Sequence, residues 1–113
     1  NLSFLMLNAK DSYSLEGVKT APPLNLREYF MLVKSADAVI AVDSASVHIA
    51  NAFNVPVAAV YANSPAAKRW APLKGSKSLV IMPESEQESN TAIDGFDVMR
   101  AVSAAEYFIK AML

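Results

Sequence analysis

The chain has 113 residues, of which 53 % are hydrophobic and 19 % charged, and its formal net charge is -1. This length is typical of one domain, and the composition is far from the polar, highly charged signature of disorder. The near-neutral charge, with no basic block, excludes the attraction on which non-specific nucleic-acid binding depends. With no cysteine and one histidine, the chain offers no disulfide, no thiolate metal site and no multi-histidine metal site. We therefore expect a globular domain with no nucleic-acid partner, no metal and no cofactor.

No stretch approaches the roughly 18 to 20 consecutive apolar residues of a membrane span. Asp37, Asp43 and His48 interrupt the most apolar region. The N-terminal apolar run also lacks the basic segment and cleavage site of a signal peptide. We expect no transmembrane segment, and the apolar start and end of the chain fit a piece of a larger protein.

The first quarter of the chain offers little regular structure. Residues 2–8 form an apolar run that predicts a strand covered on both faces. The stretch 10–24 is polar and rich in turn residues, and it predicts at most a short extended piece around Val18.

A helix and a strand follow. Asn25 stands at an N-cap position with Glu28 three residues later, as in a capping box, and predicts a helix over 26–35. The run 38–42 is the clearest buried strand of the sequence, and it ends abruptly at Asp43.

The middle of the chain repeats this alternation. Residues 45–53 are compatible with a short helix, which Asn54 and Pro56 would end. Residues 57–61 form a second buried strand.

The last part contains a loop, a strand and a helix. A loop from Ala62 leads to the apolar run 78–82, and an acidic loop over 83–92 follows. Asp94 or Asp97 would cap a final amphipathic helix. Its apolar positions alternate at spacings of four and three: Val98, Val102, Ala105, Ile109 and Met112.

Strands that alternate with helices predict an α/β domain with a mainly parallel sheet of at most four strands. In such sheets ligands bind beyond the carboxyl ends of the strands, where loops and helix N-termini gather. Two loops qualify, 43–46 and 61–70.

The segment 43–48 runs from a strand end into a helix, so that free backbone N–H groups and the positive end of the helix dipole would face an anion. The hydroxyls of Ser44 and Ser46 could add two donors. Alternatively, Asp43 or Ser44 simply caps the helix, which would occupy a donor that a phosphate needs. If the segment binds an anion, Asp43 is better placed to accept a hydrogen bond from a hydroxyl group of a ribose or a sugar.

His48 lies one turn into that helix, and a lone histidine among apolar residues is by default structural, with its ring bonded to a backbone carbonyl. The residue types of a hydrolase triad are present in Ser44, His48 and Asp43. However, the G-x-S-x-G elbow is absent, which argues against a small α/β hydrolase. Asp43 and His48 alone would leave a metal without enough ligands.

Lys68, Arg69 and Trp70 form a cationic and aromatic cluster beside the second loop. The cations could pair with phosphate, and the indole could cover an apolar face of a ligand. Alternatively, Trp70 plugs the edge of the domain and the cations remain solvated. Three more charged residues belong to a solvated acidic loop: Glu84, Glu86 and Glu88.

Several motifs follow one another in order between Ala36 and Leu73: a strand ending in Asp43-Ser44, a helix with His48-Ile49-Ala50, a strand led by Pro56, and a loop ending in Trp70-Ala71-Pro72. Together they resemble the C-terminal domain of glycosyltransferase family 9, the heptosyltransferase-like family. The segments 25–33 and 93–113 fit the helices that flank this region in the family.

The resemblance implies the C-terminal half of a GT-B fold, with residues 1–113 as one Rossmann-like nucleotide-sugar-binding domain of a larger two-domain enzyme. Such enzymes transfer a sugar from a nucleotide-diphosphate donor, typically ADP-heptose, to lipopolysaccharide or another cell-surface acceptor. The transfer inverts the configuration at the anomeric carbon and does not need the bound metal of DxD enzymes. The site residues that the resemblance implies for the donor are Asp43, Ser44, Ala45, Ser46 and His48.

The general base of these enzymes usually lies on the N-terminal acceptor domain, which is missing here, so we expect the isolated chain to be inactive. The complete enzyme would be cytoplasmic, at the inner face of the bacterial inner membrane. The family often has glycine at the positions of Ala45 and Ala62, where the backbone meets the ligand closely. These departures favour an alternative function, a non-catalytic α/β module for protein contact or weak nucleotide binding.

Overall fold

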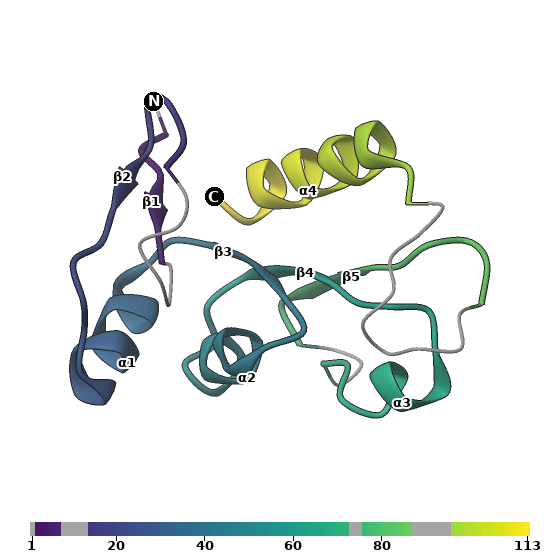
Figure 1. Cartoon of the computed structure of the whole chain (residues 1–113), viewed down its shortest axis with the longest axis horizontal. Coiled ribbons are helices and arrows are strands. Elements are labelled where there is room, and N and C mark those ends of the chain that lie inside the picture. The colour runs from purple at the N-terminus through teal and green to yellow at the C-terminus, as the bar shows by residue number, and fades with distance from the viewer. Residues whose placement is uncertain (1, 8–13, 73–75, 87–95) are drawn as a thin grey trace. The chain divides into compact units, whose positions relative to one another are not determined.

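The computed structural model describes residues 2–7, 14–72, 76–86 and 96–113 (Figure 1). The chain divides into two compact units, Asn1–Met31 and Leu32–Leu113. None of the helices in these described ranges is long and apolar enough to span a membrane.

The first unit contains two very short parallel strands, β1 (Leu5–Met6) and β2 (Lys19–Thr20). The expectation of a strand covered on both faces is wrong for the described residues 2–7, because Met6 is half-buried and the other apolar side chains of this run are exposed. A two-residue strand paired with one exposed partner has no surface against which to bury them. The short extended piece expected near Val18 is present as β2, while residues 8–13 lie outside the described part.

Helix α1 (Leu26–Ser35) confirms the predicted helix and its cap. The Glu28 amide donates to Asn25 Oδ1 at 2.9 Å, and the Asn25 amide donates to Glu28 Oε1 at 3.2 Å. This reciprocal pair is the capping box that the sequence predicts, and it satisfies two backbone donors that the helix leaves free.

The second unit is built on a parallel sheet with the order β3-β4-β5, formed by β3 (Val39–Val42), β4 (Val57–Val60) and β5 (Ser78–Ile81). The register pairs the last residues of the three strands, since Val42 lies opposite Val60 and Val60 opposite Ile81. The parallel α/β fold is therefore confirmed. The described residues form five strands in two sheets rather than at most four, because β2 is added.

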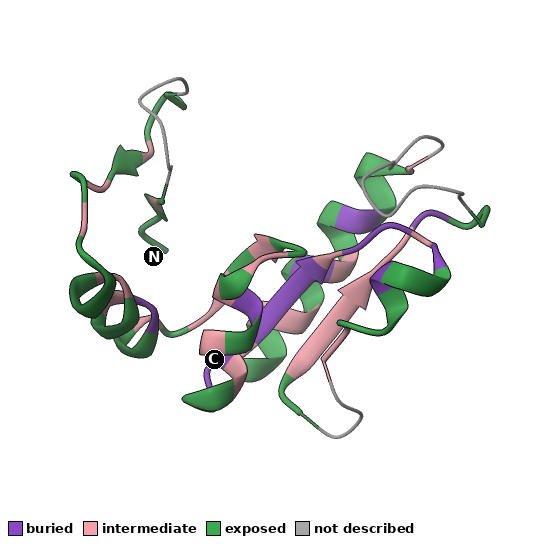
Figure 2. Ribbon diagram, turned by 60° about the horizontal axis from the view of Figure 1, so that its bottom comes forward, coloured by how far each residue is buried: buried purple, intermediate pink, exposed green. Residues whose placement is uncertain are grey.

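Helices cover both faces of this sheet. Figure 1 shows α4 (Val98–Met112) on one side of β4 and β5, and α2 (Ala45–Ala52) and the short α3 (Pro65–Lys68) on the other. The core lies along β4, which is the purple strand of Figure 2. Covering both faces of a central parallel strand explains why its sequence is apolar at every position.

The predicted end of α2 is confirmed to within one residue. Asn54 adopts a left-handed conformation with φ 58°, which asparagine tolerates better than most residues. The amide of Val55 then donates to the carbonyl of Ala50 at 2.8 Å, closing the helix before Pro56 starts the next strand.

Strand β3 is half-buried on one face and exposed on the other, which corrects the expectation that 38–42 is the clearest buried strand. Ile40 is 57 % exposed and Val42 63 %. These alternate residues share one face of the strand, and β3 is an edge strand of the sheet. Helix α4 packs on β4 and β5, so it leaves this part of the sheet uncovered.

Helix α4 begins as predicted at Asp97, whose Oδ1 accepts a hydrogen bond from the Arg100 amide at 3.0 Å; the other candidate cap, Asp94, lies outside the described residues. Its buried residues are Ala101 and Ala105. Ala105 was expected in the core and Ile109 is half-buried, but three expected core residues are exposed: Val98, Val102 and Met112. Alanine side chains allow the helix to approach the sheet closely, and this turns the three larger side chains away from it.

Candidate functional site

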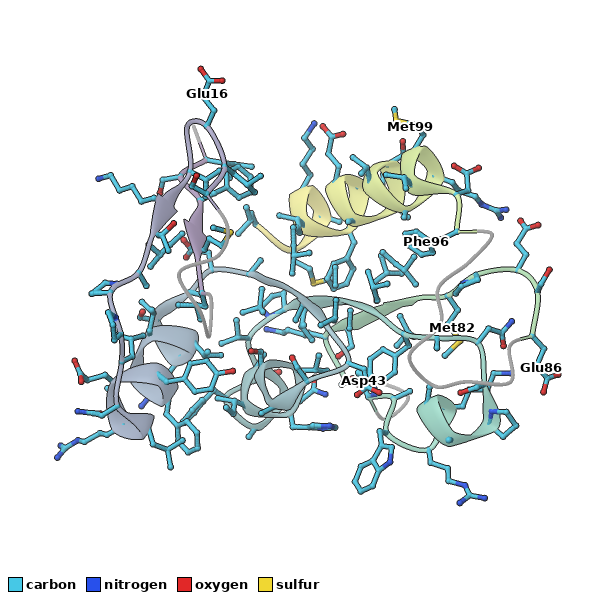
Figure 3. The ribbon with its side chains drawn as sticks, viewed as in Figure 1. Glu16, Asp43, Met82, Glu86, Phe96 and Met99 are labelled. Carbon is cyan, nitrogen blue, oxygen red and sulfur yellow. The ribbon has the colours of Figure 1, made fainter. Side chains whose placement is uncertain are left out.

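Asp43 and Tyr61 occupy equivalent places just beyond the carboxyl ends of β3 and β4. The Asp43 amide donates to the carbonyl of Val60 at 3.0 Å, and the Tyr61 amide donates to that of Ile81 at 2.9 Å. The hydrogen bonds of the sheet thus continue one residue past each strand and fix both positions. Figure 3 labels Asp43 where the chain leaves the sheet, between α2 and α3 in this view.

The residue at the N-cap position of α2 does not cap the helix with its side chain. Ser44 is the N-cap residue, with extended backbone (φ −159°), and its side chain makes no capping hydrogen bond. The first turn of the helix also contains no acidic residue. Of the two residues expected as caps, Ser44 occupies the N-cap position and Asp43 does not, but the Ser44 side chain does not supply the expected capping hydrogen bond. The positive end of the helix dipole is left without a compensating carboxylate in the first turn.

Helix α2 has an exposed side and a buried side. Val47 and Ala50 are buried against the sheet, Ser46 is half-buried, and Ala45 and His48 are exposed. The sequence predicts a structural His48, with its ring hydrogen-bonded to a backbone carbonyl. Within the described residues the ring makes no such bond, so this expectation is wrong. The His48 ring lies instead against the indole of Trp70.

The second loop contains the short helix α3, which the sequence reading missed. Ser64 is buried, and its Oγ accepts a hydrogen bond from the Ala67 amide at 3.1 Å. Pro65 occupies the first turn. A serine cap followed by proline is a recognised helix start, so the signal was present but covered only four residues.

The cationic and aromatic cluster lies at the end of α3, on the surface. Lys68 and Arg69 are exposed, and neither takes part in the ion pairs found among the described residues. Trp70 is 64 % exposed, so the alternative in which it plugs the edge of the domain is wrong. All three side chains are available to a ligand.

Tyr61 closes the loop that carries this cluster, a role that the sequence reading missed. Its side chain is 0 % exposed, and its hydroxyl donates to the carbonyl oxygen of Trp70 at 3.0 Å. Burial raises the pKa of Tyr61 above its ordinary value of 10.0, and the Asp43 carboxylate raises the pKa further. A tyrosine that ends an apolar strand gives no signal of its hydrogen-bond partner.

Asn63 joins the loops that follow β4 and β5. Its Nδ2 donates to the carbonyls of Pro83 at 2.9 Å and Glu84 at 3.2 Å. Its buried Oδ1 has no hydrogen-bond partner within the described part of the chain.

The acidic loop after β5 is described only in part. The Glu84 carboxylate pairs with Arg100, Glu86 is exposed, and Glu88 lies outside the described residues. The prediction of a solvated acidic loop holds for Glu84 and Glu86, which are both exposed, and Glu84 forms a surface ion pair in addition.

The two predicted loops meet at one place. The rings of His48 and Trp70 lie edge to face, with centroids 6.5 Å apart and an interplanar angle of 74°. One ring comes from α2 and the other from the end of the α3 loop. The arrangement therefore brings an uncapped helix N-terminus, a carboxylate at Asp43 and an exposed indole to the carboxyl edge of a parallel sheet, where ligands bind in such folds.

Two further kinds of site come into question among the described residues, a metal-binding group and a hollow on α4. Within residues 2–7, 14–72, 76–86 and 96–113, no group of three or more His, Cys, Asp or Glu is placed to hold a metal ion. A shallow hollow of about 260 Å³ is lined by four residues of α4 alone: Ser103, Glu106, Tyr107 and Lys110. It lies on the outer face of one helix and brings no second element to a ligand.

Comparison with known proteins bears directly on these two loops. The family model for glycosyltransferase family 9 (heptosyltransferase) matches residues 7–97, a range that includes both loops and the whole parallel sheet. No curated protein and no solved structure gives a significant match. With four-fifths of its length inside one family model, the chain belongs to glycosyltransferase family 9.

Proposed function

We propose that the two loops bind a nucleotide-activated sugar, and that the chain is the donor-binding domain of an inverting glycosyltransferase. The observation that carries the proposal is the contact of His48 with Trp70. It makes one continuous surface of two loops that the sequence separates. Family membership supplies the reaction class, and the uncapped start of α2 supplies a place for the negatively charged diphosphate.

The diphosphate would lie at the N-terminus of α2. Its oxygens would accept hydrogen bonds from backbone amides of the first turn and from the hydroxyls of Ser44 and Ser46. The exposed cations Lys68 and Arg69 would add charge on the other side. Donors of this kind stabilise the negative charge that develops on a leaving group, which is the largest single contribution in many enzymes.

The remaining site residues would hold the neutral parts of the donor. Asp43 would accept a hydrogen bond from a hydroxyl of the ribose or of the transferred sugar, because a carboxylate is a poor neighbour for phosphate. The largely exposed indole of Trp70, which meets the His48 ring in a T-shaped contact, would cover an apolar face such as a nucleobase. Ala45 and His48 would line the space between them.

The proposed reaction displaces the diphosphate directly. An acceptor hydroxyl attacks the anomeric carbon from the face opposite the diphosphate, and the new C–O bond forms as the bond to the phosphate oxygen breaks. The nucleoside diphosphate leaves with the electron pair, and a general base takes the hydroxyl proton. We place that base, with the acceptor, on a separate N-terminal domain, so that residues 1–113 alone would be inactive.

The family description favours heptose as the sugar, and we propose ADP-heptose as donor and lipopolysaccharide or another cell-surface saccharide as acceptor. An enzyme of this kind would act in the cytoplasm at the inner face of the bacterial inner membrane. No metal is required, because the helix N-terminus and the cations take the charge of the leaving group.

The two alanines that replace the family's glycines affect this site unequally. Ala62 is buried, with 3 % of its surface exposed, so its methyl group packs inside the protein. Ala45 is exposed at the first residue of α2, so its methyl group lies at the mouth of the proposed diphosphate site. The alanine at this position favours the alternative, a non-catalytic module with weak nucleotide affinity.

Calorimetric titration of the chain with ADP, UDP and GDP tests the proposal. We expect at least one of them to bind, and Lys68→Met or Arg69→Met to weaken that binding by about threefold to tenfold. Lys77→Met is the matched control, because Lys77 lies at the amino end of β5, opposite the site. Absence of binding by all three diphosphates would contradict donor binding and favour a protein-contact module. Binding that Lys77→Met weakens equally would show only general electrostatic attraction.

A further inference from the structure

The loop 61–70 is closed by one buried hydroxyl group. The Tyr61 side chain is 0 % exposed, and its hydroxyl donates to the Trp70 carbonyl oxygen at 3.0 Å. A buried hydroxyl without a partner costs free energy, so this bond persists as long as the tyrosine stays in place. It ties the end of the loop to the first residue after β4.

This bond completes the fixation of the Trp70 backbone. The Trp70 amide donates to the carbonyl of Ala67 at 3.0 Å, and the Trp70 carbonyl accepts from Tyr61. Both polar groups of the residue are therefore anchored, one by α3 and one by the sheet. The indole is largely exposed, so little packing holds it, and its contact with His48 depends on where the backbone is held.

We propose that Tyr61 is a positioning residue of the donor site, whose hydroxyl holds Trp70 beside His48 before any ligand arrives. This rests on the proposed function, since it assigns the Trp70 indole to the donor. Tyr61 does not itself touch a ligand, because it is fully buried. Its effect is on affinity: an aromatic group already in place loses less conformational freedom when a ligand binds.

The other anchor of the loop provides a comparison. Asn63 ties the loop to the carbonyls of Pro83 and Glu84, beyond β5, and its hydrogen bonds within the described residues reach neither Trp70 nor His48. If the two anchors merely stiffen the loop, removing either one should disturb Trp70 to the same extent. If Tyr61 specifically holds the indole beside His48, only the loss of Tyr61 should disturb that contact.

The test compares Tyr61→Phe with Asn63→Ala and with Tyr107→Phe, the matched control on the exposed face of α4. The chain has one histidine and one tryptophan, so the His48 ring-proton shifts and acrylamide quenching of Trp70 fluorescence each report one residue. We expect Tyr61→Phe to move the His48 shifts, to increase quenching and to weaken ADP binding by about threefold to tenfold. Tyr107→Phe should change none of these, and Asn63→Ala should leave the His48 shifts in place.

Several results would overturn the proposal. One is a Tyr61→Phe variant with unchanged shifts, quenching and ADP affinity; another is an Asn63→Ala variant that moves the His48 shifts as far. In the wild-type chain the Tyr61 hydroxyl proton should exchange slowly with water, and fast exchange would contradict the bond without any variant. If wild type binds no ADP, UDP or GDP, the proposed function fails and the donor role of Tyr61 fails with it. The shifts and quenching then still decide whether Tyr61 holds Trp70.

Discussion

The rings of His48 and Trp70 meet edge to face, 6.5 Å between centroids, although one belongs to α2 and the other follows α3. This arrangement is favourable for two aromatic rings. Its position matters more than its energy, because it brings together the two loops at the carboxyl edge of the sheet.

Asp43→Asn should weaken the binding of an ADP-sugar but not the binding of pyrophosphate. We expect the variant to bind an ADP-sugar about tenfold more weakly, because a charged acceptor of a hydroxyl hydrogen bond is lost. Inorganic pyrophosphate has no such hydroxyl, so its binding should not weaken. Asp37→Asn removes the same charge from the opposite end of β3 and serves as the control. Equal weakening of both ligands by Asp43→Asn would contradict its assignment to a hydroxyl group.

Trp70→Ala should weaken nucleotide binding without unfolding the chain. The indole is 64 % exposed, so its removal should change the free energy of unfolding by less than about 1 kcal/mol. The loss of a covering aromatic face should raise the Kd for ADP by roughly tenfold. Tyr107→Ala, which removes an aromatic side chain that is 79 % exposed on α4, should leave that Kd unchanged. Calorimetry and thermal denaturation of the two variants measure both effects.

The stability of the chain should fall in alkaline solution, partly because of Tyr61. Burial and the Asp43 carboxylate raise the pKa of Tyr61 above 10.0, so the folded chain holds this proton to a higher pH than the unfolded chain. Its contribution is complete below about pH 10 and is lost as the pH rises through the raised pKa. Tyr61→Phe should therefore lose less stability than wild type above about pH 10. Urea denaturation across this range tests the sign, and Tyr107→Phe should behave like wild type.

The same substitution, valine to alanine, should reduce the free energy of unfolding by different amounts on two neighbouring strands. Val57→Ala removes two methyl groups from a fully buried site on β4 and should reduce the free energy of unfolding by about 2 kcal/mol. Val42→Ala on β3 changes a side chain that is 63 % exposed and should cost less than about 0.5 kcal/mol. Equal costs would mean that the open face of β3 is covered in solution.

The sequence predicts the helix ends of the chain well, because their signals are local. The reciprocal bonds of Asn25 and Glu28, the left-handed Asn54 and the cap at Asp97 each depend on residues a few positions apart. The position of the two loops at one edge of the sheet is also predicted, since the carboxyl ends of parallel strands must meet there.

The errors concern burial and long-range partners, which local patterns do not specify. An apolar run such as 38–42 indicates a strand but not how many neighbours will cover it, and β3 lies at an edge. The core face of α4 is set by two alanines that fit closely against the sheet rather than by the larger Val98 and Val102. The hydrogen bond from Tyr61 to Trp70 depends on the path of a loop, and no periodicity reveals it.

The most direct measurement maps the backbone amide shifts of the chain during titration with ADP. The central claim, that the loops after β3 and β4 form one donor site, predicts saturable changes at residues 44–48 and 62–70 together, with one shared dissociation constant. The amides of α4 along 103–110, which line the shallow hollow on its outer face, should not respond. Changes confined to one loop, or centred on α4, would contradict the claim.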